Sequence, residues 1–140
     1  MEAMRISVSG LDVEWQRLEI ISQNLANANT TRTGSGDPYQ PLRLVSGPDF
    51  TFTDLVGGAS ALSSPTGVRV YNVEQTAAPT RAVHDPDHPH ADEDGMVHYP
   101  GLDHAQEMTM LLQTSRVYEA NLSAISTARQ MYSAAMNMGQ

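Results

Sequence analysis

The feature that most constrains this chain is its last long segment, residues 104–138, which contains neither glycine nor proline. Apolar side chains recur through it at alternating steps of three and four residues, the heptad pattern of a helix that packs along another helix. The seam consists of Met108, Leu111, Ser115, Tyr118, Leu122, Ile125, Arg129, Tyr132 and Met136. At ~1.5 Å per residue, the pattern predicts a helix roughly 50 Å long.

The same segment carries few charges. A second row of small and apolar residues runs beside the seam, and the only charged residues other than histidine are Glu107, Arg116, Glu119 and Arg129. A helix that only covers a core keeps a charged face for water. One interpretation is the interior helix of a small bundle. A chain of 140 residues with one other good helix has too few internal partners for that, so we predict burial by other subunits.

The first segment, residues 3–29, repeats the pattern of the last. Its seam consists of Met4, Val8, Leu11, Trp15, Leu18, Ser22 and Leu25. Gly10 weakens this helix by about 1 kcal/mol relative to alanine, and the Asn- and Thr-rich run at 27–31 predicts its end. Because the chain goes out and returns, we expect the two terminal helices to pair as an antiparallel coiled coil, with Trp15 as an interface anchor.

The middle of the chain has a different composition, because all 8 prolines lie between Pro38 and Pro100. Alternating and β-branched residues predict short strands at 39–45, 68–73 and 95–99, and the Gly/Ser-rich span 47–67 predicts a mobile loop. Asp103, with Gln106 three residues later, predicts the start of the last helix. The fold class is therefore mainly α with a small β-rich insert, divided into a helix at 1–31, a central module at 32–102 and a helix at 103–140.

Composition excludes several classes of protein. The net charge is −8 and lysine is absent, which disfavours nucleic acid or an anionic membrane as a partner. Without cysteine there is no disulfide framework or thiolate nucleophile. No run approaches the ~18 apolar residues of a membrane span, so we expect no direct membrane insertion. The N-terminus does not resemble a cleaved secretory signal.

One stretch could carry chemistry, because all 5 histidines lie between His84 and His104 among six acidic residues. Imidazole and carboxylate ligands suit Zn, Ni or Cu, so a soluble metal-binding protein using residues 84–104 is the alternative interpretation. Prolines make the stretch extended and no motif places ligands on a regular element. We favour a structured acidic loop without metal. No nucleophile elbow, P-loop or triad spacing is present, so we expect no enzyme activity and no cofactor.

Several stretches resemble the flagellar basal-body rod protein family, and most closely its proximal-rod members. Residues 9–11 and 21–31 are similar to the signature shared by rod and hook proteins, and residues 107–131 resemble the family's C-terminal helix. The more specific match is residues 85–100, which are similar to a proximal-rod stretch of the form DPxHPxAxxxGxVxYP. The motif residues that we single out are Asp85, Pro86, His88, Pro89, Gly95, Tyr99 and Pro100, and Ala91 and Val97 also fit the pattern.

The resemblance implies a non-enzymatic structural subunit of the bacterial flagellar rod that assembles through its terminal helices into the axial drive shaft. Its partners would be copies of itself, other rod subunits, proteins at the junction of membrane ring and rod, and the flagellar type III export apparatus. Its location would be the basal body, after export without a cleaved signal peptide. The expected assembly interface is Leu11, Trp15, Leu18, Ile21, Asn24, Leu25, Asn27, Leu111, Tyr118, Asn121, Leu122, Ile125 and Tyr132.

Overall fold

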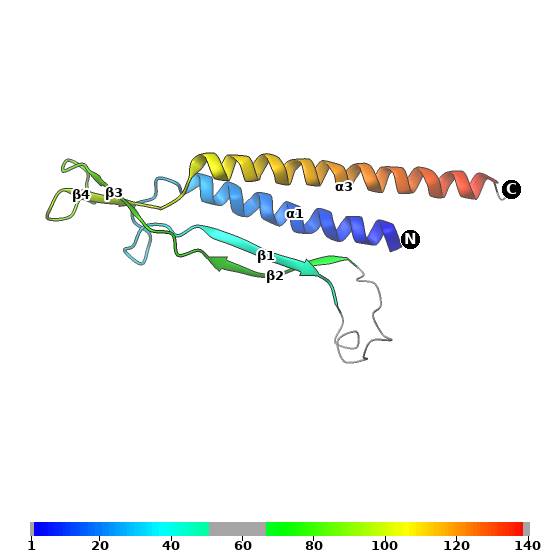
Figure 1. Ribbon diagram of the computed structural model, residues 1–140, viewed down its shortest axis with the longest axis horizontal. Coiled ribbons are helices and arrows are strands. Elements are labelled where there is room, and N and C mark those ends of the chain that lie inside the picture. The colour runs from blue at the N-terminus through cyan, green and yellow to red at the C-terminus, as the bar shows by residue number, and fades with distance from the viewer. Residues whose placement is uncertain (1, 51–66, 139–140) are drawn as a thin grey trace.

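The computed structural model describes residues 2–50 and 67–138. Its elements follow in the order α1 (Glu2–Ala26), β1 (Leu42–Pro48), β2 (Val68–Gln75), β3 (Arg81–His84), β4 (Met96–Tyr99) and α3 (His104–Met138). The elongated molecule places α1 between α3 and the β1–β2 pair, and the β3–β4 pair projects beyond the helices (Figure 1). A helix at each end with a small antiparallel insert between them is therefore confirmed.

The end of α1 is set by side chains that compete for backbone hydrogen bonds. Asn27 Nδ2 donates to the carbonyl oxygen of Gln23 at 2.9 Å, and Thr30 Oγ1 donates to Asn27 Oδ1 at 3.1 Å. The Asn27 backbone amide also donates to the Gln23 carbonyl oxygen, at 3.1 Å, so the Asn27 side chain competes with the backbone for this acceptor in the last turn. The helix therefore ends at Ala26, just before the Asn- and Thr-rich run where its end was predicted.

The start of α3 is capped as the sequence predicts. Asp103 Oδ1 accepts hydrogen bonds from the backbone amides of Ala105 at 2.9 Å and Gln106 at 3.3 Å. A carboxylate at this position also interacts favourably with the positive end of the helix dipole. The observed helix runs over His104–Met138, the range predicted from its lack of glycine and proline.

The two helices pack side by side and run in opposite directions. Near one end of α1 the glycine at position 10 faces Asn121, and a Cβ at Gly10 would lie 3.0 Å from Asn121 Nδ2. Near the other end Asn24 Nδ2 lies 3.3 Å from Glu107 Oε2. Gly10, a weak point in an isolated helix, is therefore where α3 approaches closely. Continued at the same rise, this register places Met4 level with about residue 127 of α3.

The larger sheet is an antiparallel pair of strands, β1 and β2, that lies against α1 (Figure 1). Its register runs from Leu42↔Gln75 to Pro48↔Val68, with a shift between Val45 and Ser46. The predicted strand at 39–45 therefore begins later and extends further, and β2 is longer than predicted.

The predicted mobile loop at 47–67 was wrong at its first residues. Gly47 and Pro48 belong to β1, because they pair with Arg69 and Val68 and because Tyr71 OH donates to the Pro48 carbonyl oxygen at 2.5 Å. Asp49 and Gly67 continue the contact beyond the strands, through a 2.9 Å backbone hydrogen bond. Residues 51–66 of this span lie outside the described residues.

A second antiparallel pair forms the tip of the molecule. β3 was not predicted from the sequence, and it pairs with β4 from Arg81↔Tyr99 to His84↔Met96. β4 confirms the strand predicted at 95–99, one residue shorter.

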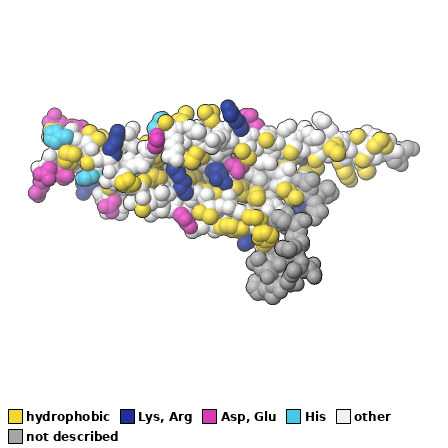
Figure 2. Space-filling view, viewed as in Figure 1, with side chains coloured by type: hydrophobic (Ala, Val, Ile, Leu, Met, Phe, Trp, Pro, Cys, Tyr) yellow, Lys and Arg dark blue, Asp and Glu magenta, His cyan; other side chains and the backbone are white. Residues whose placement is uncertain are grey.

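The hydrophobic core is small. Among the described residues, the buried apolar side chains of the hydrophobic core are Val13, Ile20 and Ile21 on α1 and Val97 on β4. Large apolar side chains remain exposed on both helices, and hydrophobic atoms are visible along the surface as far as the C-terminal end of α3 (Figure 2). Few helices of a self-sufficient domain leave this much apolar surface in water.

Candidate functional site

A buried amide joins three elements where the helices meet β1. Asn24 on α1 is 0% exposed, and its Nδ2 donates to the Leu42 carbonyl oxygen at 2.9 Å and to Glu107 Oε2 at 3.3 Å. Its Oδ1 accepts from the Leu42 amide at 2.9 Å and from Tyr39 OH at 3.0 Å. The amide therefore uses both donors and both acceptor positions, the condition under which a buried polar group is tolerated.

A buried carboxylate completes this group of side chains. Glu107 on α3 is 1% exposed. It forms an ion pair with Arg43 on β1 and accepts a hydrogen bond from the Arg43 guanidinium. Arg43 Nη1 also donates to the Leu42 carbonyl oxygen at 3.2 Å. We call Asn24, Tyr39, Leu42, Arg43 and Glu107 the polar junction. Because each partner satisfies another, an axial shift of α1, β1 or α3 would leave buried polar groups without partners.

The hydroxyl of Tyr39 keeps its proton in this setting. Burial raises the pKa of Tyr39 above its usual 10.0, the negative charge of Glu107 raises it further, and the positive charge of Arg43 partly opposes both. The protonated hydroxyl is the form that can donate to Asn24 Oδ1. Since the pKa is raised, this contribution is fully present below pH 10 and is lost only as the pH rises through the folded value.

The outer faces of the helices form the second candidate feature. Trp15 on α1 and Tyr118 on α3 lie with ring centroids 6.3 Å apart at an interplanar angle of 48°. Trp15 is nevertheless 60% exposed, and the nearby Leu122 is 46% exposed. A tryptophan left open on a surface is typical of a contact site for another protein.

The residues that we predicted as an assembly interface divide into three classes of burial. Ile21 and Asn24 are buried inside the chain, and Trp15, Leu122 and Tyr132 are exposed. The half-buried members are Leu11, Leu18, Leu25, Asn27, Leu111, Tyr118, Asn121 and Ile125. Arg43, Tyr39 and Glu107 were missed. The signal that could have found Glu107 was its position as an isolated acid in the first turn of an otherwise nearly uncharged helix.

The motif at 85–100 forms the turn that joins β3 to β4, the strand β4 itself and the proline after it. Gly95 has a φ of +71°, and a Cβ there would meet Pro86 Cβ at 3.2 Å and His84 Nε2 at 3.3 Å. The positive φ favours glycine, and a Cβ would in addition press on Pro86 and His84. Asp85 and Gly95 close the turn through a 2.9 Å backbone hydrogen bond.

The rest of the motif packs beneath this turn. The Tyr99 ring lies under the Arg81 guanidinium at 5.6 Å and next to His88 at 6.4 Å. Pro100 is buried, whereas Pro89 is exposed. These contacts give the motif residues a structural role in shaping the tip.

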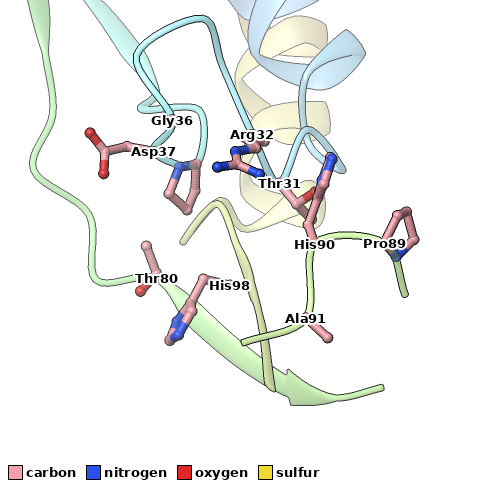
Figure 3. A pocket seen from close by; sticks show the side chains of 10 residues that line it. Thr31, Arg32, Gly36, Asp37, Thr80, Pro89, His90, Ala91 and His98 are labelled. Carbon is pink, nitrogen blue, oxygen red and sulfur yellow. The ribbon is translucent and has the colours of Figure 1, made fainter. Parts of the chain in front are cut away.

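The histidines do not converge on a common point. His90 Nδ1 hydrogen-bonds Thr31 Oγ1 at 2.8 Å, and Figure 3 shows His98 on the other side of a hollow of about 530 Å³. Within residues 2–50 and 67–138, no three His, Asp or Glu side chains are placed to hold one metal ion. The metal-binding alternative is therefore not favoured. Over the same residues, neither helix combines the length and apolar character of a membrane span.

Asp92 gives the tip a testable pH dependence. The amide of Met96 donates to Asp92 Oδ1 at 2.8 Å and lowers the pKa of Asp92 below its usual 3.8, and the Asp94 amide at 3.0 Å and His98 lower it further. Because the folded pKa is lowered, the contribution of Asp92 is complete above pH 3.8 and is lost as the pH falls through the folded value.

We expect the NMR amide shifts of Asp94 and Met96 to titrate together with a midpoint below pH 3.8. In Asp92→Asn, which has no carboxyl group at this position, both amides should lose that titration. A midpoint at or above 3.8 in the unmodified chain would contradict the geometry of this turn.

Two family profiles match the ends of the chain. The profile described as "Flagella basal body rod protein" matches residues 4–32, and the profile described as "Flagellar basal body rod FlgEFG protein C-terminal" matches residues 93–138. The first span contains most of α1 and the turn after it, and the second contains β4 and α3.

Whole-chain relatives extend this similarity. Flagellar basal-body rod protein FlgC of Escherichia coli O6:H1 is 33% identical over 135 residues, covering 96% of this chain and 94% of that protein. FlgC of Borreliella burgdorferi is 30% identical over 147 residues, with 96% and 93% covered. FlgC of Bacillus subtilis is 30% identical over 146 residues, with 99% and 97% covered. The resemblance seen in the sequence is confirmed, and the chain belongs to the flagellar basal-body rod protein family.

Proposed function

We propose that this chain is a structural subunit of the proximal part of the bacterial flagellar rod and that it acts by packing rather than by catalysis. The observation that carries the proposal is the apolar surface that the two helices leave open, including Trp15 at 60% and Leu122 at 46% exposure. Exposed apolar surface of this kind indicates a protein interface. Membership of the rod family supplies the assembly in which that surface would be covered.

In this proposal the terminal helices pair as an antiparallel coiled coil and form one unit with the neighbouring subunits. Residues 1–31 and 103–140 would be the axial part, and residues 32–102 would be a separate outer module. The antiparallel contact of α1 with α3 supports this division, and so does the position of both sheets on one side or beyond the helices (Figure 1). The polar junction would fix the outer module relative to the axial part.

The predicted interface is narrowed by the burial of its members. Ile21 and Asn24 are covered within the chain, so we assign them to the internal packing of the subunit. The exposed and half-buried members remain the proposed contacts with neighbours. The proposed neighbours are other copies, other rod subunits and proteins at the ring–rod junction. In this proposal the chain reaches them after export through the flagellar apparatus, without cleavage of a signal peptide.

Co-purification tests the proposal directly. In a flagellated bacterium whose own copy of the gene is replaced by one encoding an epitope-tagged form of this chain, we expect the tag to be recovered with detergent-isolated basal bodies and motility to depend on the chain. Recovery only in soluble fractions of motile cells would contradict a role in the rod.

A pair of adjacent substitutions tests whether the open helix face is the interface. Leu122→Asp places a charge on the proposed contact, and we expect recovery in basal bodies to fall more than tenfold, with loss of swimming in soft agar. Because Leu122 is 46% exposed, the stability of the free chain should change by less than about 1 kcal/mol. The matched control is Ser123→Asp, one exposed position further around the helix, which should assemble normally. Motile cells carrying Leu122→Asp would contradict the assignment.

A further inference from the structure

The C-terminal end of α3 has no partner among the described residues of its own chain. The C-terminal end of α3 extends past the N-terminus of α1 (Figure 1). In this part of the helix Met131, Met136 and Met138 are 68%, 60% and 82% exposed. No charged residue occurs from position 130 to 138. A helix end of this length is only marginally stable in water. We call residues 129–138 the α3 tail.

A hollow on α1 provides a surface of matching chemistry. It has a volume of about 400 Å³ and is lined by Trp15, Leu18, Glu19 and Ser22. The ring of Tyr118 supports one part of the indole, and the rest of Trp15 remains open, at 60% exposure. Thioether sulfurs make favourable contacts with aromatic rings, so the methionines of the tail suit this hollow. We call it the Trp15 hollow.

We propose that the α3 tail of one copy packs into the Trp15 hollow of a second copy, an inference that rests on the proposed function above. The tail cannot reach the hollow of its own chain, because α3 is one uninterrupted helix that passes Trp15 at Tyr118 and continues away from it. A lipid surface fits the hollow less well, because Glu19 contributes a carboxylate to its lining.

The symmetry of this contact follows from its two different surfaces. A contact between a tail and a hollow leaves the hollow of one copy and the tail of the other free, so further copies can add at both ends. Trp15 lies level with Tyr118, and the middle of the tail lies some 16 residues further along α3. At ~1.5 Å per residue, neighbouring copies are displaced by roughly 25 Å along the helix axis. Such an open, staggered contact suits an elongated assembly.

Cysteine cross-linking of the full chain in basal bodies tests the proposal, because the natural sequence contains no cysteine. The test variant carries Ser22→Cys at the hollow and Ser133→Cys on the tail. After mild oxidation and a non-reducing gel, we expect a ladder of dimers, trimers and larger species. A disulfide requires Cα atoms within ~7 Å. The matched control, Ser22→Cys with Ser126→Cys, moves the second cysteine ~10 Å back along the same side of α3 and should cross-link at least tenfold less.

Each other outcome has a defined meaning. Basal bodies that contain the test variant but give no ladder would overturn the inference and leave the proposed function intact. Dimers formed by Ser133→Cys alone would indicate a tail-to-tail contact and would also overturn it. Absence of the unmodified chain from basal bodies would overturn the proposed function itself, and the inference with it.

A second pair of variants decides the matter without cysteine, for the case in which the cysteine variants do not assemble. Met136→Asp should reduce recovery in basal bodies more than tenfold. Asn137→Asp, which introduces aspartate at the neighbouring position, should leave recovery unchanged. Equal recovery of the two variants would overturn the inference.

Discussion

Replacing Asn24 by alanine is expected to lower the free energy of unfolding by about 3 kcal/mol. The substitution removes four hydrogen bonds at a position that is 0% exposed. It leaves the Leu42 amide and the Tyr39 hydroxyl without their partner, and each unsatisfied buried group costs about 1–3 kcal/mol. Chemical denaturation of the purified chain, followed by far-UV circular dichroism, measures the change.

Two further variants separate hydrogen bonding from shape. Asn24→Asp keeps the shape of the side chain but has no donor for the Leu42 carbonyl oxygen, and it places a second carboxylate 3.3 Å from the position of Glu107 Oε2. We expect it to destabilise the chain at pH 7 at least as much as Asn24→Ala, because like charges in a buried site repel. Asn29→Ala is the control, because Asn29 is exposed, and its effect should stay within about 0.5 kcal/mol. If Asn24→Asp left the free energy of unfolding unchanged, the junction would not depend on the amide donor.

The helices could be predicted from sequence because their signals are local. The range of α3 follows from the absence of glycine and proline and from Asp103 at its start, and the end of α1 follows from the side chains of Asn27 and Thr30. Each of these interactions joins residues at most four positions apart. Local competition for backbone hydrogen bonds is readable in a single sequence.

The polar junction could not be predicted, because its partners are far apart in sequence. Asn24 and Glu107 are separated by 83 positions, and Arg43 and Glu107 by 64. In sequence Glu107 resembles a charge that favours the start of a helix, and Asn24 resembles a polar residue on the outside of one. Only the packing of α1 against α3 and β1 turns both inward. Strand β3 was missed for a related reason, since four residues give little pattern until β4 pairs with them.

The same limitation affected the helix faces. The heptad pattern identified an apolar row on each helix, but the line of closest contact includes Gly10, Asn24, Thr114 and Asn121, which are small or polar. Those residues allow close approach and hydrogen bonding within the chain. The apolar rows remain partly open beside this line, as Trp15 and Leu122 show. Periodicity alone does not distinguish a face that covers the subunit's own core from a face kept for a neighbour.

Replacing Gly101 by alanine is expected to lower the free energy of unfolding by at least about 2 kcal/mol and to displace the tip of the molecule. A Cβ at Gly101 would lie 1.8 Å from the carbonyl oxygen of Pro79 and 2.8 Å from its carbonyl carbon. Both are backbone atoms, so the clash cannot be relieved by a change of rotamer, and overpacking of this kind typically costs 1–3 kcal/mol or more. This contact joins the segment that enters β3 to the segment that leaves β4 for α3, so it holds the tip in place relative to the helices.

The control for this clash is Gly34→Ala, because an added Cβ there meets nothing within 4 Å. We expect Gly34→Ala to change stability by less than about 1 kcal/mol, in the stabilising direction, since alanine reduces the freedom of the unfolded chain. Hydrogen exchange locates the effect of Gly101→Ala. Protection of the backbone amides should fall first in Arg81–His84 and Met96–Tyr99, while the amides of α1 stay protected. Equal stability of the two variants would contradict the close contact of Gly101 with Pro79. Uniform loss of protection in both helices would instead mean that the tip and the axial helices unfold as one unit.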